Sequence, residues 1–345
     1  MIVIFVTSPP NIVPALQILH RDPQHEYVIV TSDESIRKYF ESFENDLRIY
    51  FFEEIDYRLS KNIFRFMRNM VDSYRLLKKA KEVFRKFDCS EIIYFTIAFG
   101  ESSMAYMNIL PHRHSVKISR YILVKNILPQ KPNYSMRNIL NALMAKIILK
   151  IPVKYYGPNS VPVVQERYLI QNNIMTKIWV KDSLLPLQQK LASKIQLNFQ
   201  FDKIKVLFVT QDAIGSGDVD SDEYIYKMDE LIYRIQQEIG NENIYIKPHP
   251  QVPALYGRER QLKLIPEVIP SELIMANFDI VIGYSSMSLI EASKNNQVAI
   301  SLLKYINATS APRFKNYYKY LENNSTSIRY PTRIAETVKA IKMER

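Results

Sequence analysis

The chain has 345 residues and carries 46 Lys or Arg against 35 Asp or Glu, which gives a formal net charge of +11. This length is enough for two domains with buried cores, and a hydrophobic content of 47% excludes a largely disordered chain. The single cysteine, Cys89, excludes an internal disulfide, and the presence of only 7 glycines argues against glycine-rich phosphate-binding loops.

The excess of positive charge favours one of three partners: nucleic acid, an anionic membrane surface or an acidic small substrate. The sequence contains no run of 18 or more uncharged apolar residues, so we expect no segment that spans a bilayer. The first residues lack the basic start and the apolar length of a signal peptide. Together these features predict a cytoplasmic protein.

The first half of the chain alternates strand-like and helix-like segments. Four short apolar runs are typical of strands buried on both faces of a parallel sheet: residues 2–6, 27–31, 48–52 and 92–96. We expect helices to start near Asn11 and after Ser32, with Ser32 as the cap of the second helix. This alternation predicts an α/β domain with right-handed crossovers.

Two longer helices rich in Lys and Arg are expected at residues 61–87 and 137–151. Their apolar residues recur at helical spacing and are expected to face the core: Phe64, Met67, Val71, Tyr74, Leu77 and Phe84 in the first helix, and Ile139, Leu140, Leu143, Ile147 and Ile148 in the second. The alternative is attraction to an anionic membrane surface through basic side chains. In the first helix these are Arg65, Arg68, Lys78, Lys79, Arg85 and Lys86.

The second half repeats this alternation. Strands are expected at residues 205–210, 244–247, 278–283 and 298–302, and helices at residues 224–239 and 288–294. The predicted fold class is therefore α/β, with two Rossmann-like domains facing across a cleft. We place the first domain at residues 1–200, the second at residues 201–330 and a C-terminal helix at residues 331–345.

Three polar motifs lie in the second half, and two of them follow predicted strands. Open α/β sheets bind ligands at that edge. The first motif is Lys247-Pro248-His249-Pro250, in which two prolines restrict the backbone around His249. It is either an ordinary turn or a means of directing a cation or hydrogen-bond donor at a phosphate.

The second motif, Gly283-Tyr284-Ser285-Ser286, precedes a predicted helix. Its serines either cap that helix or join the backbone N–H groups at the helix start in binding an anion without a metal. The third motif is centred on Glu272. This residue either stabilises the start of a helix or accepts hydrogen bonds from ribose hydroxyls.

In combination, these motifs resemble those of bacterial sialyltransferases of the GT-B fold, in which a His-Pro motif is followed by a Ser-Ser motif. The resemblance is closest to the lipooligosaccharide sialyltransferase family, glycosyltransferase family 52. It extends to the strand and proline turn at residues 5–10 and to the strand that ends at residues 209–211. It covers residues 1–20 and about 205–295.

The resemblance implies a donor site for CMP-sialic acid in the second domain. His249, Ser285 and Ser286 would hold the phosphate and Glu272 would contact the ribose, and the rest of the donor site would come from Lys247, Pro250, Gly283 and Tyr284. The reaction would be an inverting displacement without metal or cofactor, because fixed donors stabilise the charge on the departing CMP. The acceptor would be a galactose-ended surface glycan, lipooligosaccharide or capsule, bound by the first domain. The C-terminal helix would pack on that domain.

The mechanism also requires a general base on the acceptor hydroxyl. The resemblance places this base upstream of the His-Pro motif, where the candidates are Asp222, Asp220 and then Asp218. The alternative is a solvated acidic loop that caps the next helix. An acidic-acidic-glycine motif found in several related enzymes is absent, which leaves Glu101 as a minor candidate.

Other functions are also compatible with the sequence. One keeps the fold and changes the donor to another CMP-linked nonulosonic acid or a UDP-hexose. A remote alternative is a nucleic-acid-binding protein, but no stacking motif is present and nucleic acid is not expected as a partner. His112 and His114 either bind an acceptor or phosphate or are simply solvated. Monomer and homodimer are equally compatible with the sequence.

Overall fold

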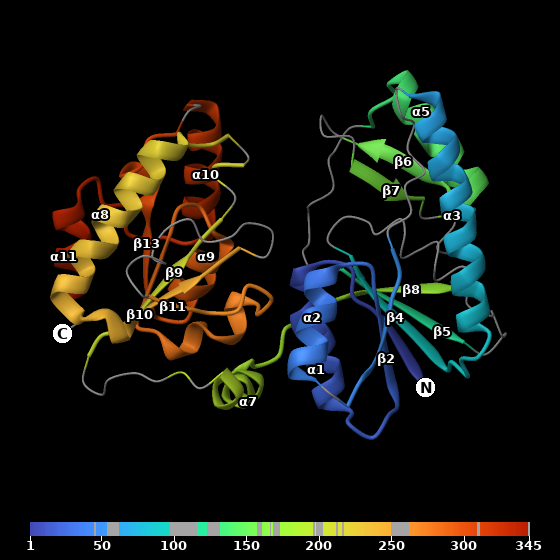
Figure 1. Ribbon diagram of the computed structural model, residues 1–345, viewed down its shortest axis with the longest axis horizontal. Helices are drawn as coiled ribbons and strands as arrows, with labels where there is room; N and C mark the ends of the chain where they lie inside the picture. The colour runs from blue at the N-terminus through green and yellow to red at the C-terminus, as the bar shows by residue number, and fades with distance from the viewer. Residues whose placement is uncertain are drawn as a thin grey trace. The chain divides into compact units, whose positions relative to one another are not determined.

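The computed structural model divides the chain into two compact units, Met1–Asp182 and Ser183–Arg345. Each unit has its own parallel sheet (Figure 1). The residues that the structure describes are 1–44, 46–53, 62–96, 116–122, 132–156, 161–165, 167, 173–195, 197, 203–211, 213–215, 217–249, 262–308 and 311–343.

Within the described residues, six parallel strands form the sheet of the first unit in the order β3-β2-β1-β4-β5-β8. They are β1 (Ile2–Phe5), β2 (Tyr27–Thr31), β3 (Arg48–Phe51), β4 (Glu91–Thr96), β5 (Lys117–Ile122) and β8 (Ile174–Ile178). A separate antiparallel pair is formed by β6 (Val153–Tyr156) and β7 (Val161–Val164). The interior strands β1 and β2 are buried throughout, as apolar runs in parallel sheets are.

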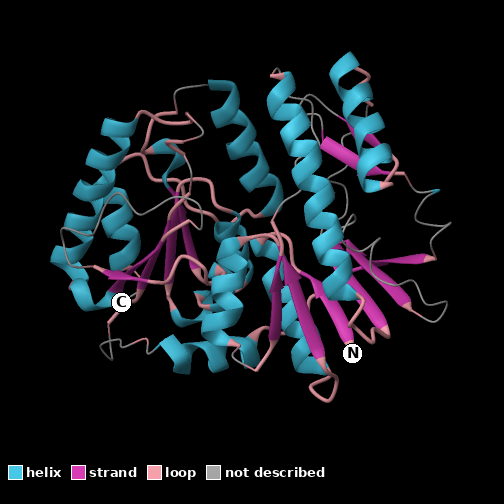
Figure 2. Ribbon diagram, turned by 45° about the vertical axis from the view of Figure 1, so that its right-hand side comes forward, coloured by secondary structure: helices cyan, strands magenta, loops and turns pink. Residues whose placement is uncertain are grey.

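Helices flank this sheet (Figures 1 and 2). They are α1 (Ile12–Arg21), α2 (Glu34–Phe43), α3 (Ile63–Phe84) and α5 (Met136–Met144), the last followed by a π-helical turn, Ala145–Leu149. The cap of α2 is Asp33, whose carboxylate accepts the N–H groups of Ser35 and Ile36. The prediction of Ser32 as this cap was wrong by one residue.

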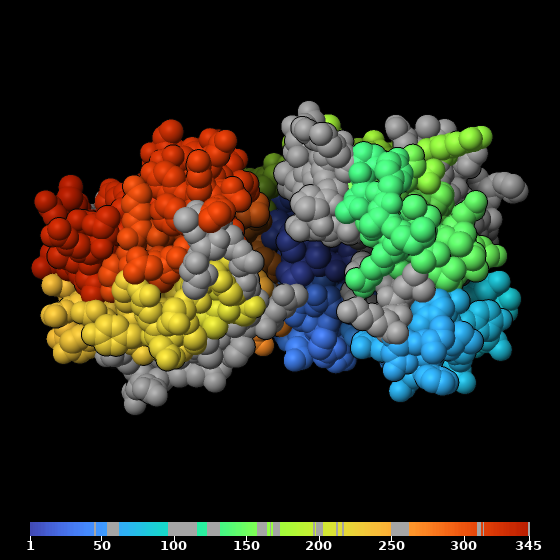
Figure 3. All heavy atoms as spheres, turned by 90° about the horizontal axis from the view of Figure 1, so that it is seen from above, coloured from blue at the N-terminus to red at the C-terminus, as the bar shows by residue number. Residues whose placement is uncertain are grey.

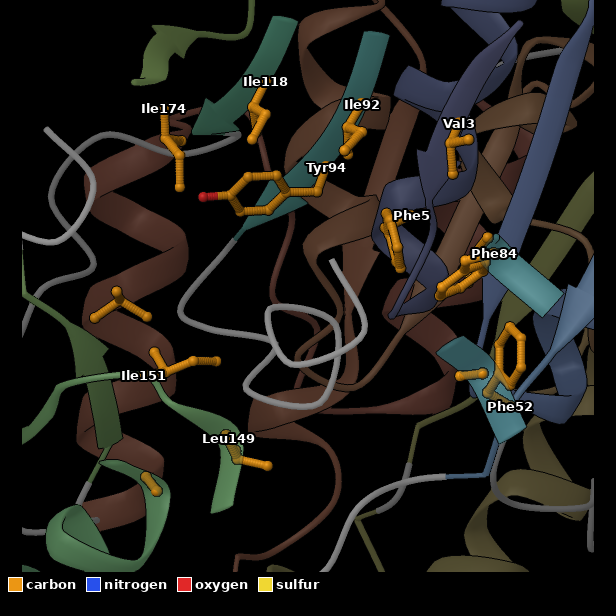
Figure 4. Packing of buried hydrophobic residues seen from close by; sticks show 14 of the residues in the cluster. Val3, Phe5, Phe52, Phe84, Ile92, Tyr94, Ile118, Leu149, Ile151 and Ile174 are labelled. Carbon is orange, nitrogen blue, oxygen red and sulfur yellow. The ribbon is translucent and has the colours of Figure 1, made fainter. Parts of the chain in front are cut away.

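The core of the first unit lies between its sheet and its helices. Alternate residues of the strands point into it, among them Val3 and Phe5 of β1 and Tyr94 of β4 (Figure 4). Phe84 of α3 is fully buried, and its ring centroid lies 6.4 Å from that of Phe5 and 5.1 Å from that of Phe52. These aromatic contacts fix the C-terminal part of α3 against the sheet.

The inner sides of α3 and α5 differ from the prediction. α3 buries Ser73, Ala80 and Phe84, while α5 and its π-helical turn bury Asn138, Asn141, Ala145 and Leu149. Most of the predicted core residues are instead exposed: Phe64, Met67, Val71, Tyr74, Ile139, Leu140, Leu143 and Ile147. Small side chains such as Ala80 and Ala145 let these helices pack close to the same core, which leaves no room there for the larger residues.

The second unit is built on a five-stranded parallel sheet within the described residues, in the order β11-β10-β9-β12-β13. Its strands are β9 (Val206–Val209), β10 (Ile244–Lys247), β11 (Lys263–Leu264), β12 (Ile280–Gly283) and β13 (Val298–Ser301). The first four strands of the first unit are arranged in the same way around β1. Both sheets are therefore doubly wound, and the predicted class of two Rossmann-like α/β domains is confirmed.

The helices of the second unit are α7 (Leu185–Ile195), α8 (Ser221–Ile239), α9 (Met287–Lys294), α10 (Ala311–Asn324) and α11 (Ile334–Lys342). The side chains of Leu187 and Leu191 in α7 are buried, so the division falls after Asp182 and not after residue 200 as expected. The C-terminal helix α11, expected on the first domain, belongs to the second unit and packs on α8. An ion pair of 2.9 Å between Lys342 and Glu238 joins the two helices.

Candidate functional site

The three motifs singled out in the sequence lie in the second unit, two of them directly after strands of its sheet. The chain passes from β9 outward to β10 and β11, and then returns to β12 on the other side of β9. The direction of winding therefore reverses between β9 and β12, and ligands of open α/β sheets bind beyond the carboxyl ends of the strands at this point. The residues that follow β9, β10 and β12 form the candidate site.

Gly283 brings the ends of β9 and β12 close together. It lies opposite Val209 in the strand register, and a Cβ atom at this position would be 3.2 Å from the Val209 carbonyl oxygen. That distance is shorter than ordinary van der Waals contact. Gly283 therefore contributes to the site by allowing the turn after β12 to approach β9.

Two hydrogen bonds join the segments that follow β9 and β12. The Gln211 Nε2 group donates to Ser285 Oγ over 2.7 Å, and the Ser285 backbone N–H donates to Gln211 Oε1 over 2.8 Å. Gln211 thus fixes both the side chain and the backbone of Ser285. Because Ser285 Oγ accepts one of these bonds, its own hydrogen can still be donated to a ligand. This contact could not be found from the sequence, since a single Gln after a strand forms no recognisable pattern.

Ser286 is the N-cap of α9. Its Oγ accepts the backbone N–H of Ser288 over 3.2 Å, so the capping interpretation is confirmed for this serine. The Ser286 hydroxyl hydrogen can also be donated elsewhere. Ser285 and Ser286 therefore present two hydroxyl groups where the positive end of the α9 dipole lies.

The backbone of His249 is tied to the end of β9. Its N–H donates to Thr210 Oγ1 over 2.7 Å, and the Thr210 N–H donates to the carbonyl oxygen of Lys247 over 3.0 Å. The side chain of His249 is half-buried at this edge. Pro250, predicted to belong to the donor site, lies outside the described residues, and its role stays a prediction.

Lys247 is buried and donates from Nζ to the carbonyl oxygens of Pro248, over 2.6 Å, and Glu267, over 3.0 Å. Burial lowers the pKa of Lys247 to about 7, an effect that the nearby carboxylate of Glu267 only partly offsets. This side chain joins the end of β10 to the loop around Glu267. Its predicted contact with the donor stays a prediction.

Glu272 lies in a short 3-10 helix, Ser271–Leu273, and is half-buried. Its carbonyl oxygen accepts Gln188 Nε2 of α7 over 2.8 Å. The hydroxyl groups of Ser271 and Ser288 are hydrogen-bonded over 2.7 Å. The segment that carries Glu272 is therefore joined directly to the first turn of α9.

Tyr284 is the second residue of the Gly-Tyr-Ser-Ser motif, and its ring points into the protein. Its hydroxyl group is buried without a hydrogen-bond partner among the described residues, and burial, with Asp218 nearby, raises its pKa. The ring meets that of Tyr224 edge-on at 6.4 Å. The backbone carbonyl oxygen of Tyr284 accepts a hydrogen bond from Ser301 Oγ over 2.7 Å. Only the backbone of Tyr284 therefore lies at the sheet edge.

The three acidic candidates have different surroundings. Asp218 is buried and accepts the hydroxyl of Tyr317 from α10 over 2.8 Å. Asp220 is the N-cap of α8 and accepts the N–H of Glu223 over 2.9 Å. Asp222, in the first turn of α8, is exposed, and its carboxylate has no hydrogen bond or ion pair within the described part of the chain. Of the three, Asp222 is the one that a substrate hydroxyl can reach without displacing an internal bond.

Two further predictions concern other candidate residues and the need for a metal. Glu101, His112 and His114 lie outside the described residues, so their roles stay predictions. In the described part of the chain, no three side chains of His, Cys, Asp or Glu gather closely enough to hold a metal ion. That the reaction itself requires no metal stays a prediction.

No protein-family model matches the sequence, and a search of curated proteins finds no relative. Among solved structures, a glycosyltransferase of kitacinnamycin aligns over 99% of this chain and 90% of its own, with 11% identity and a TM-score of 0.46. The glycosyltransferase SnogD from Streptomyces nogalater aligns over 100% and 99%, with 12% identity and a TM-score of 0.42. A UDP-N-acetylglucosamine 2-epimerase from Rickettsia bellii aligns over 99% and 86%, with 14% identity and a TM-score of 0.42. Likenesses this distant do not indicate what the chain binds.

The hydrogen bonds at the carboxyl edge of the second sheet indicate what kind of group could bind there. Hydrogen bonds connect the residues after β9 with those after β10 and β12, and a further bond adds the segment of Glu272. Among the described residues, Ser285 and Ser286 each keep a hydroxyl hydrogen that can be donated beside a helix N-terminus, a combination suited to an anionic group such as a phosphate. The arrangement can therefore bind an anionic group.

Proposed function

We propose that this chain is a glycosyltransferase that moves sialic acid from CMP-sialic acid to a galactose-ended bacterial surface glycan. The reaction is an inverting displacement that requires no metal. One observation carries the proposal: paired hydrogen bonds with Gln211 fix the side chain and the backbone of Ser285 at the switch point of the second sheet, where a phosphate could be bound. The motif resemblance to lipooligosaccharide sialyltransferases supplies the identity of the nucleotide and the sugar.

In this proposal the donor phosphate lies at the start of α9. The hydroxyls of Ser285 and Ser286 donate to it, and each remains oriented because its oxygen already accepts a fixed internal donor. The bond from the anomeric carbon to the phosphate oxygen breaks, and CMP leaves with the electron pair. Negative charge on the phosphate rises during this step, so donors fixed in advance lower the barrier. His249, with its backbone fixed by Thr210, is a third donor to the same group.

The acceptor hydroxyl attacks the opposite face of the anomeric carbon and gives its proton to a general base. We assign that role to Asp222, the exposed carboxylate at the start of α8. Asp220 caps α8 and Asp218 binds Tyr317, so both have structural roles in the same loop. The ribose of the donor is assigned to Glu272, whose segment is joined to α9 through Ser271.

The test uses the full chain with CMP-sialic acid and lactose in the presence of EDTA. Wild-type protein is expected to release CMP and form sialyllactose, whereas His249→Ala and Ser285→Ala lose most of this activity. His25→Ala and Ser327→Ala are matched controls, because both residues are partly exposed and lie outside the site. Removal of one fixed donor to a developing charge is expected to cost about a hundredfold or more in kcat.

A binding measurement separates the donor from the acceptor. Isothermal titration with CMP, UDP and GDP is expected to give binding of CMP alone. CMP binding without turnover would retain the donor site and exclude lactose as the acceptor. Preferential binding of UDP would instead favour the UDP-hexose alternative, and absence of binding by all three nucleotides would refute the proposal.

A further inference from the structure

Two helices of the first unit expose large apolar side chains to solvent. On α3, Phe64 is 82% exposed and Tyr74 70% exposed, and Met67 lies between them. On α5 and its π-helical turn, Met136 is 72% exposed and is followed by Leu143 and Ile147. We call these six residues the apolar face. α3 packs against the π-helical turn, and the light-blue atoms of α3 reach the surface in Figure 3.

The orientation of α5 is fixed by polar residues on its inner side. Asn138 and Asn141 are buried, and the Asn138 amide donates to the carbonyl oxygen of Asn133 over 3.3 Å. Ala145 and Leu149 continue the same inner side into the core. Rotating α5 to bury its apolar residues would remove Leu149 from the core and break the Asn138 bond. The apolar side of α5 therefore has no place inside its own unit.

On α3, apolar residues give way to basic residues along a single line. The residues at 67, 71 and 74 are apolar, and Lys78, Lys81 and Arg85 continue at the same spacing of three or four residues. These three basic side chains are exposed. One surface of α3 thus offers apolar side chains in its first turns and positive charge in its last turns.

The charge of this region restricts its partner. Residues 62–86 contain eight Lys or Arg against two Asp or Glu, and residues 134–150 contain three Lys or Arg and no acidic residue. These two segments carry nine of the eleven net positive charges of the chain. A second copy would place the same positive charge against this one, and a nucleic acid would leave the apolar residues in water. An anionic lipid surface takes up both the charge and the apolar side chains.

We propose that the apolar face inserts into the interface of an anionic lipid bilayer, with α3 and α5 lying along the membrane plane. None of the described helices is both long and apolar enough to cross a membrane, so the attachment is at the surface. The basic residues of α3 contact lipid head groups, while Phe64 and Met136 enter the acyl boundary. This attachment uses the first unit alone and does not depend on the proposed reaction.

Co-sedimentation with vesicles tests the proposal. The protein is expected to bind vesicles of phosphatidylglycerol and phosphatidylcholine at low salt and to remain in solution with phosphatidylcholine alone. Phe64→Ser is expected to weaken binding by about tenfold or more, since a buried Phe side chain is lost. Lys78→Gln combined with Lys79→Gln is expected to weaken it by roughly thirtyfold. Because these side chains are exposed, the folded state should tolerate each change.

Matched controls lie in the second unit. Tyr226→Ser removes an exposed aromatic residue from α8, and Lys315→Gln combined with Lys319→Gln removes two exposed charges from α10. These variants are expected to bind vesicles as the wild type does. In addition, Phe64→Trp adds a second tryptophan to Trp179, the single one in the chain. Its emission is expected to be quenched by brominated acyl chains, with wild-type protein as the baseline.

Three results would overturn the proposal. The first is absence of binding to anionic vesicles at low salt. The second is unchanged vesicle binding by Phe64→Ser together with unquenched Phe64→Trp, which would reduce the contact to charge alone. The third is a lipid-free dimer that Phe64→Ser converts to a monomer, which would assign the apolar face to a second copy of the chain.

Discussion

Lys247 makes the stability of the second unit depend on pH. Its ammonium group is buried, and the pKa falls from 10.5 to about 7 on folding. Between these two values the unfolded chain binds more protons than the folded one, so stability rises with pH. The cost of burying Lys247 to the free energy of unfolding is absent above pH 10.5. It grows as the pH falls towards 7 and changes little below that.

The magnitude follows from the same two values. Each pH unit over which the unfolded state holds one additional proton changes the free energy of unfolding by about 1.4 kcal/mol. Allowing for partial titration near pH 7, the wild type should lose about 2 kcal/mol relative to Lys247→Met between pH 9 and pH 7. Other titrating groups are common to both proteins and cancel in this comparison.

The assay is urea unfolding of both proteins at pH 7, 8 and 9. Circular dichroism follows the whole chain, and the fluorescence of Trp179 follows the first unit in parallel. The difference is expected in the transition of the second unit only. If the wild type and Lys247→Met show the same pH dependence, folding does not lower the pKa of Lys247 and the reasoning fails.

Three further changes test the site and the fold. Gln211→Ala removes both bonds to Ser285 and is expected to weaken CMP binding by about tenfold or more in isothermal titration, and CMP affinity equal to wild type would contradict this. Phe84→Ala should lower the unfolding free energy of the first unit by about 3–5 kcal/mol in urea, followed by Trp179 fluorescence. Asp33→Ala, which removes the cap of α2, should cost about 1 kcal/mol in the same assay, and Ser32→Ala should cost less.

Much of the fold could be predicted because its central strands are continuous apolar runs. Residues 2–6, 27–31 and 205–210 form interior strands of their sheets, with a neighbouring strand on each side, and the residues of β1, β2 and β9 are buried on both faces. β5 was not predicted, since Lys117, Ser119 and Arg120 interrupt its apolar residues. Ser119 is nonetheless buried, because its hydroxyl donates to the carboxylate of Glu91 over 2.9 Å.

In the candidate site, too, some residues could be predicted from the sequence and some contacts could not. Ser285 and His249 could be singled out because each follows a strand and has a distinctive neighbour. The contact between Gln211 and Ser285 joins residues 74 positions apart, and it depends on β9 and β12 being neighbours in the sheet. Local sequence patterns contain no information on strand order, so such a contact could not be predicted.

The two basic helices show why helical spacing alone was misleading. Spacing identifies the line of apolar residues on a helix but not the direction in which that line points. In α5, Ile139, Leu140 and Leu143 were expected to face the core, yet Asn138 and Asn141 are the residues that face the interior. A helix with an apolar outer side gives the same periodicity as one with an apolar inner side.

The short helix α7 has a consequence for how the second unit can be separated from the first. α7 precedes the sheet, yet Gln188 supports the carbonyl oxygen of Glu272, and Leu187 and Leu191 are buried beside the same 3-10 segment. A fragment cut after residue 200 would lack this support and expose apolar surface under Glu272. A fragment that starts at Ser183 would retain it. α7 thus supports the segment that carries Glu272, at the ribose end of the proposed donor site, although the sequence placed it in the first domain.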